Sequence, residues 1–273
     1  MLNLIMSRFF KFNLDKKFLI KISFIIALSI LSSFMLYGCG FSQVSKTDKL
    51  KSVLYYRIGS GYFNSGNYVK ALQDFIKART VNPYSAKNYN AMGTVYMMTH
   101  RQNKAIKCFK KATRLNNKFS YAFYNLAMIY IKLKKYHLAA ANLKKALLNP
   151  FYNQPYESYT LLGKIYIIQN KFKKAKKYLL ISEALNRKYF LTYYYLGSYY
   201  SKRGKFLEAI IDYKKTLKID AYFVPAQFKE GENYFKLKRY KKARAIFSKI
   251  YIQNKLNSFG IKASDYLKKL KNY

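Results

Sequence analysis

The residue types that most often perform chemistry are sparse and scattered in this sequence. It has two histidines, His100 and His137, and neither has a Cys, Asp or Glu neighbour at the spacing of a metal site. Only 11 acidic residues are present, and the closest pair, Glu230 and Glu232, faces different directions on a helix. No glycine-rich phosphate loop and no nucleophile beside a base is found. The sequence therefore predicts no metal site, no catalytic residue and no bound cofactor, and we expect a protein that is not an enzyme.

Cys39 is the residue whose surroundings indicate a covalent modification. A basic stretch precedes an uncharged run, residues 22–37, which leads into Gly38 and Cys39. A helix of that length spans about 24 Å, short of the roughly 30 Å hydrocarbon core, so the run fits a secretion signal better than a membrane span. The segment Leu36-Tyr37-Gly38-Cys39 resembles a bacterial lipobox, in which the Cys carries a lipid and begins the mature chain. The alternative is an uncleaved signal anchor with a buried Cys.

The second cysteine and the charge have simpler interpretations. With Cys39 acylated, Cys108 has no partner, so we expect no disulfide and a small buried hydrophobic side chain at Cys108. The formal charge is +41, from 52 Lys and Arg against 11 Asp and Glu. This charge reflects the composition of an AT-rich genome, attraction to a polyanion, or solvation of the surface. Export would exclude nucleic acid as a partner and leave anionic lipid as the natural counter-surface.

One pattern recurs six times along the chain at a period of 34 residues, apart from one longer interval. Each copy has a bulky residue, an apolar-small pair, a Tyr, an Ala, a second large side chain and, in most copies, a further small residue. The first copy reads Tyr55, Ile58-Gly59, Tyr62, Ala71, Phe75 and Ala78. This is the pattern of tetratricopeptide repeats, and the six predicted repeats are residues 52–85, 86–119, 120–153, 156–189, 190–223 and 224–257.

The spacing within each copy predicts two packed helices, here called helix A and helix B. The aromatic, small and Tyr positions of helix A share one face, and the small residue allows helix B to approach closely. No single repeat can bury its apolar face alone, so neighbours must stack. We therefore expect an all-α right-handed superhelix, closed by an amphipathic capping helix over residues 258–273. Residues 1–38 form the predicted signal peptide and residues 39–51 a linker.

The third and fourth repeats are separated by two extra residues. Ala127 and Gly163 are 36 residues apart, where the preceding intervals are 34. The insertion lies in a segment with two of the four prolines, residues 149–158. Either the longer turn offsets the two repeats from each other, or it is an insertion that a surface turn tolerates.

The concave groove of such a superhelix, lined by helix A, is the expected binding surface. Two positions of helix A carry apolar and amide side chains beyond those that the repeat pattern requires. At the fifth position Tyr and Asn favour partner binding, whereas at the twelfth position partner binding and local packing are equally compatible. The predicted groove residues are Tyr56, Phe63, Asn90, Met97, Tyr124, Ile131, Ile167, Tyr194, Phe228 and Phe235.

Many lysines lie elsewhere, at the starts of helix B, where they are expected on the convex face. Residues 170–177 and 238–244 are the densest examples. They form either a solvated outer face or, once the N-terminus is tethered, a surface that contacts anionic lipid.

The lipobox, the six repeats, the cap and the lengthened junction together resemble the type IV pilus biogenesis lipoproteins of the PilF/PilW/Tgl group, which are secretin pilotins. The resemblance implies a lipoprotein on the periplasmic face of the outer membrane that binds secretin subunits and promotes their assembly. Gly40 after Cys39 agrees with sorting to the outer membrane. The alternative is a periplasmic adaptor that recruits cell-wall hydrolases or synthases.

Overall fold

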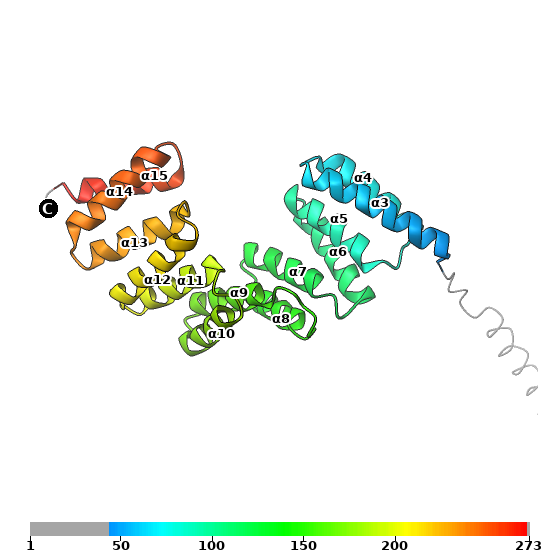
Figure 1. The fold of residues 1–273 in the computed structure, drawn as a ribbon, viewed down its shortest axis with the longest axis horizontal. Coiled ribbons are helices and arrows are strands. Elements are labelled where there is room, and N and C mark those ends of the chain that lie inside the picture. Colours follow the sequence, from blue (N-terminus) through cyan, green and yellow to red (C-terminus); the bar gives the residue numbers. More distant parts are fainter. Residues whose placement is uncertain (1–43, 272–273) are drawn as a thin grey trace, which may run out of the picture. The chain divides into compact units, whose positions relative to one another are not determined.

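The structure, a computed structural model, describes residues 44–271. This part of the chain is all-helical and forms six antiparallel helix pairs followed by one further helix (Figure 1). Helix A and helix B of successive repeats are α3/α4, α5/α6, α7/α8, α9/α10, α11/α12 and α13/α14. The helices are α3 (Lys46–Asn64), α4 (Tyr68–Val81), α5 (Ala86–Met98), α6 (Gln102–Leu115), α7 (Ser120–Lys132), α8 (Tyr136–Ala146), α9 (Pro155–Ile168), α10 (Phe172–Leu185), α11 (Phe190–Lys202), α12 (Phe206–Ile219), α13 (Val224–Lys236), α14 (Tyr240–Asn254) and α15 (Ser258–Lys269).

The expected all-α repeat architecture is confirmed, but the linker is shorter than predicted. Helix α3 begins at Lys46 rather than in the first repeat, so residues 46–51 are helical. Asp48 lies in its first turn, where a carboxylate interacts favourably with the helix dipole. The predicted signal peptide and Cys39 lie outside the described residues. Among the residues described, no helix combines the length and apolar character required to span a bilayer.

The small residue of helix A sets the distance between the two helices of a repeat. A Cβ added to Gly93 would lie 2.6 Å from the Phe109 ring, and one added to Gly197 would lie 2.7 Å from the Tyr213 ring. Such distances are well below van der Waals contact, so only glycine allows the large side chain of helix B to pack here. The same pairing joins Gly59 to Phe75, Gly163 to Leu179 and Gly231 to Phe247.

Small residues on helix B complete the packing. These side chains are fully buried and allow neighbouring helices to approach closely: Ala71, Ala78, Ala105, Ala112, Ala139, Ala146, Ala175, Ala209 and Ala243. Three repeats differ, because Ser182, Thr216 and Ile250 replace the second Ala and are also fully buried. A buried hydroxyl needs a hydrogen-bond partner, so the repeats with Ser182 and Thr216 must supply one.

The longer junction after α8 is anchored rather than loose. The Asn149 amide donates to the Lys118 carbonyl at 2.9 Å. Tyr152 is 6% exposed and packs against Phe123 and Ala146. The insertion thus adds a buried aromatic residue to the interface between the third and fourth repeats.

Helix α15 covers the last repeat, as the sequence predicts. Its Tyr266 ring stacks on Phe247 at 4.5 Å, and Ala263 and Leu270 are fully buried. The Arg244 guanidinium donates to the Leu270 carbonyl and ties the end of the cap to α14. A terminal repeat would otherwise expose its apolar face, and this helix buries it.

Candidate functional site

The ten predicted groove residues, here called the helix A surface, all lie on the first helix of their repeats. Most of these side chains are partly exposed: Tyr56, Phe63, Asn90, Met97, Tyr124, Ile131, Tyr194 and Phe235. Ile167 and Phe228 are only 5% and 6% exposed. Partner binding by the helix A surface stays a prediction, and these two buried positions offer little area to a partner.

A small pocket lies at the N-terminal end of the helix A surface. It has a volume of about 230 Å³ and lies between α3 and α5, where Tyr56, Phe63 and Asn90 contribute to its lining. The Asn125 amide of the next repeat donates to Asn90 Oδ1 at 3.0 Å. Three of the four predicted residues of the first two repeats are therefore brought together in one pocket, and Met97 is not part of its lining.

At the other end, the capping helix occupies part of the helix A surface. The Phe228 ring contacts Phe247, Phe259 and Tyr266 at centroid distances of 5.5–5.8 Å. Phe235 also packs against Tyr266. These two residues serve the interface with α15, and a pocket of about 430 Å³ remains beside them, with Tyr194, Lys229 and Glu232 in its lining.

The middle of the surface contains a carboxylate that sequence reasoning did not single out. Glu157 lies in the first turn of α9, and its carboxylate lies near the Tyr124 hydroxyl on α7. Burial raises the pKa of Glu157 above its ordinary value, an effect that the neighbouring Tyr124 hydroxyl opposes. Burial also raises the pKa of Tyr124, and the nearby Glu157 charge raises it further. Tyr189 approaches the same carboxylate, and burial raises its pKa as well.

Lys164 is the second residue that sequence reasoning did not single out. Its ammonium lies 5.5 Å from the centroid of the Tyr195 ring on α11, a cation–π contact. Burial lowers the pKa of Lys164, because the protein replaces part of the water that stabilises its charge. Burial raises the pKa of Tyr195 to about 12. A half-buried charge on an aromatic surface is a typical binding determinant. The half-burial of Lys164 results from the packing of α9 between its neighbours, so the sequence alone did not indicate it.

Beneath this surface is a hydroxyl cluster that belongs to the core. Thr160, Ser182 and Thr192 are fully buried, and their oxygens are 2.7–2.9 Å from one another. Ser182 also donates to the Tyr156 carbonyl at 2.8 Å. The cluster explains the Ser in place of Ala, since each hydroxyl finds a partner, and Thr160 is unavailable to a ligand.

The remaining polar features do not assemble into a reactive site within residues 44–271. No group of three or more potential metal ligands occurs there. His100 adopts a φ of 58° in the turn between α5 and α6, as Lys134 and Asn170 do in the equivalent turns. Its role is thus that of a left-handed turn residue. Cys108, predicted as a small buried side chain, is half-buried, because it lies at the edge of the core cluster of the first two repeats. Burial raises the pKa of its thiol.

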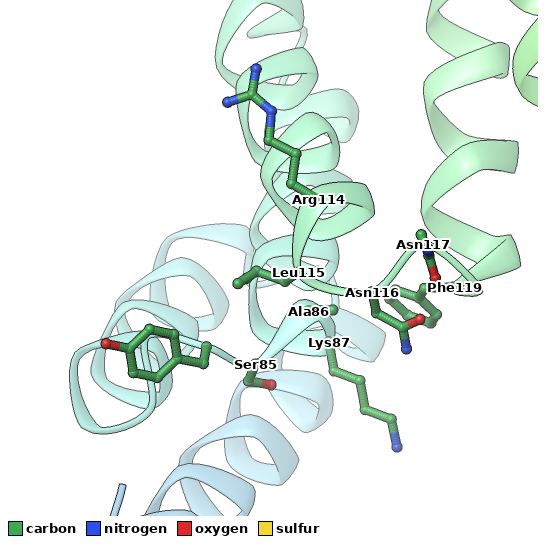
Figure 2. Close-up of a pocket in the computed structure, with 9 residues that line it drawn as sticks. Ser85, Ala86, Lys87, Arg114, Leu115, Asn116, Asn117 and Phe119 are labelled. Atoms are coloured by element: carbon green, nitrogen blue, oxygen red, sulfur yellow. The ribbon is translucent and has the colours of Figure 1, made fainter. Parts of the chain in front are cut away.

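A pocket of about 540 Å³ lies between the start of α5 and the turn from α6 to α7 (Figure 2). Figure 2 shows the Lys87 and Arg114 side chains extending in opposite directions rather than converging on one point. The turn contributes Asn116, Asn117 and Phe119. The pocket therefore has amide and cationic groups at its rim but no nucleophile paired with a base.

The Lys-rich start of α10 lines a separate pocket of about 600 Å³. Lys173, Lys176 and Lys177 are exposed there, next to Arg203 from the turn after α11. Arg203 donates to the Tyr199 hydroxyl at 2.9 Å. Four cations without a carboxylate in the lining make this an electropositive surface, and contact with anionic lipid stays a prediction.

Comparison with known proteins agrees with this architecture. One tetratricopeptide repeat model matches residues 86–119, 120–148 and 156–188, and a second matches residues 225–253. The chain is 27% identical over 167 residues to the type IV pilus assembly protein PilF of Pseudomonas aeruginosa, which covers 59% of this chain and 66% of PilF. It is also 33% identical over 90 residues to tetratricopeptide repeat protein 21A of Mus musculus, of which it spans only 7%.

Solved structures show the same fold. The structure of Pseudomonas aeruginosa PilF superposes with a TM-score of 0.71 at 18% identity, covering 81% of this chain and 99% of PilF. The structure of PilW, described as a widely conserved type IV pilus biogenesis factor, has a TM-score of 0.72 at 17% identity and covers 77% of this chain and 97% of PilW. Parts of the chain therefore match tetratricopeptide repeats, and the chain is similar to PilF in sequence and to PilF and PilW in fold.

Proposed function

We propose that the chain is a lipid-anchored scaffold on the periplasmic face of the outer membrane, which binds secretin subunits and promotes their assembly during type IV pilus biogenesis. The observation that carries the proposal is the similarity to PilF, which covers 59% of this chain in sequence and 99% of PilF in fold. The lipobox-like segment that ends at Cys39 supports the anchor.

The mechanism has two physical parts. An acyl chain contributes about 0.8 kcal/mol per buried CH₂, and two or more chains give durable attachment. The helix A surface supplies aromatic contact area and a few hydrogen-bonding groups for a protein partner. Holding both partners at one membrane raises their effective concentration, so a modest affinity of the helix A surface is sufficient.

Cys39→Ala tests the anchor. We expect the repeats of this variant to remain folded and the protein to be released from membranes on fractionation. We also expect fewer secretin multimers to assemble in cells that carry it. Cys108→Ala is the matched control, because it removes the other cysteine and is expected to leave location and assembly unchanged. Normal secretin multimers in the Cys39→Ala strain would show that lipid-dependent targeting is not the function.

A further inference from the structure

Two ionisable side chains lie on the same face of α9, one in its first turn and the other about two turns further along the helix. Glu157 and Lys164 are seven residues apart, which is close to two helical turns and about 10 Å along the axis. Glu157 contacts Tyr124 from α7, and Lys164 contacts Tyr195 from α11. The two charges therefore mark opposite ends of one strip in the middle of the helix A surface.

Neither charge has an oppositely charged partner within the described chain. The ion pairs found there join other residues: Lys77–Asp74, Lys205–Glu208, Lys215–Asp212, Lys229–Glu232 and Lys268–Asp265. In a chain with 52 basic residues, a half-buried carboxylate that meets only tyrosine hydroxyls is unusual. Partial burial has already removed some water from both groups, so each is poised to gain from a matching charge.

We propose that this strip binds an extended peptide segment of the partner protein that carries one basic and one acidic side chain about three residues apart. The basic side chain contacts Glu157 and the rings of Tyr124 and Tyr189, and the acidic side chain contacts Lys164. The inference rests on the proposed function of the chain as a protein-binding scaffold. In an extended polyproline II segment, side chains three residues apart lie on the same face and about 9 Å apart, which matches the separation of the two charges. Tyrosines around a carboxylate suit a cation, because their ring faces attract it.

The probe is a blocked, fluorescein-labelled peptide with Lys and Glu separated by two residues on a Ser and Tyr background. Binding to the full-length chain in nonionic detergent is followed by fluorescence anisotropy at low and high salt. Glu157→Gln keeps the acceptor for Tyr124, and Lys164→Met keeps the aliphatic stem against Tyr195. We expect each variant to bind the peptide at least fivefold more weakly, and added salt to weaken binding to the wild-type chain. Glu208→Gln, on the exposed face of α12, is the matched control and is expected to bind like wild type.

Modified peptides assign each charge to its partner. A peptide with Gln in place of its Glu should respond to Glu157→Gln but not to Lys164→Met, and one with Gln in place of its Lys should show the reverse. Equal binding by wild type and both variants, tighter binding of an all-acidic peptide, or self-association of the chain that depends on these residues would overturn the proposal.

Two further outcomes separate this inference from the proposed function. If Glu157→Gln and Lys164→Met lose peptide binding while deletion of the chain leaves secretin assembly normal, the strip binds its peptide but the pilus role fails. If both variants bind the peptide like wild type while deletion of the chain abolishes secretin assembly, the pilus role stands and the strip is not the site.

Discussion

Replacing Gly163 by Ala tests whether the small residue of helix A sets the packing distance within a repeat. An added Cβ would lie 2.5 Å from Cγ and 2.6 Å from Cδ2 of Leu179 on α10. Leu179 is fully buried, so its side chain has no free space into which it can move. We expect overpacking to cost about 1–3 kcal/mol. The higher helix propensity of Ala relative to Gly offsets about 1 kcal/mol of this packing cost.

Gly61→Ala is the control that isolates the packing term. Gly61 is exposed in α3, and a Cβ there would meet nothing within 4 Å. That variant should gain about 1 kcal/mol of stability from helix propensity alone. The Gly163→Ala variant should therefore be about 1–3 kcal/mol less stable than Gly61→Ala.

Denaturant unfolding followed by far-UV circular dichroism measures the difference. Shortening the neighbour removes the atoms that would clash, so Gly163→Ala should become stabilising in a Leu179→Ala background. If Gly163→Ala proves as stable as Gly61→Ala in the chain with native Leu179, close helix approach is not the reason for the glycine, and the packing argument fails.

Two further predictions concern polar groups. Ser182→Ala should destabilise the fold by about 1–3 kcal/mol, since the Tyr156 carbonyl loses its donor. Exposed Ser65→Ala is the control in the same thermal unfolding assay, and equal effects of the two would contradict this. Burial raises the folded pKa of Glu157, so its ionised form destabilises the fold above that pKa and the penalty disappears below the unfolded pKa of about 4.3. The Tm of Glu157→Gln relative to wild type should therefore fall as pH is lowered from about 7 to 4, and a difference that rises would refute the assignment.

Much of the fold was predictable because its information is local and repeated. The spacing of Gly163, Tyr166 and Ala175 specifies one helix pair, and five other segments repeat it. The same regularity predicted α15, because an amphipathic segment follows the last repeat, whose apolar face must be covered. The linker was predicted less well, because residues 46–51, of which all but Leu50 are polar or charged, carry no repeat signal although they extend α3.

The site was less predictable because it depends on what surrounds each residue. Phe228 occupies the same repeat position as Tyr124, yet α15 covers it and leaves Tyr124 partly exposed. Glu157 and Lys164 are ordinary surface residue types in the sequence. Their significance comes from partial burial and from the lack of an opposite charge nearby, and both follow from the packing of α7, α9 and α11. The one sequence signal for Glu157 is the rarity of acidic residues, since the chain has only 11 of them against 52 basic residues.

Site-specific photo-crosslinking in cells tests the central claim most directly. A photoreactive amino acid is placed at Met97 on the helix A surface or at Tyr222, which is 90% exposed in the turn before α13. The account predicts crosslinks to the secretin subunit from Met97 and none from Tyr222. Secretin crosslinks from Tyr222 alone, or an absence of secretin at both positions in piliated cells, would contradict it.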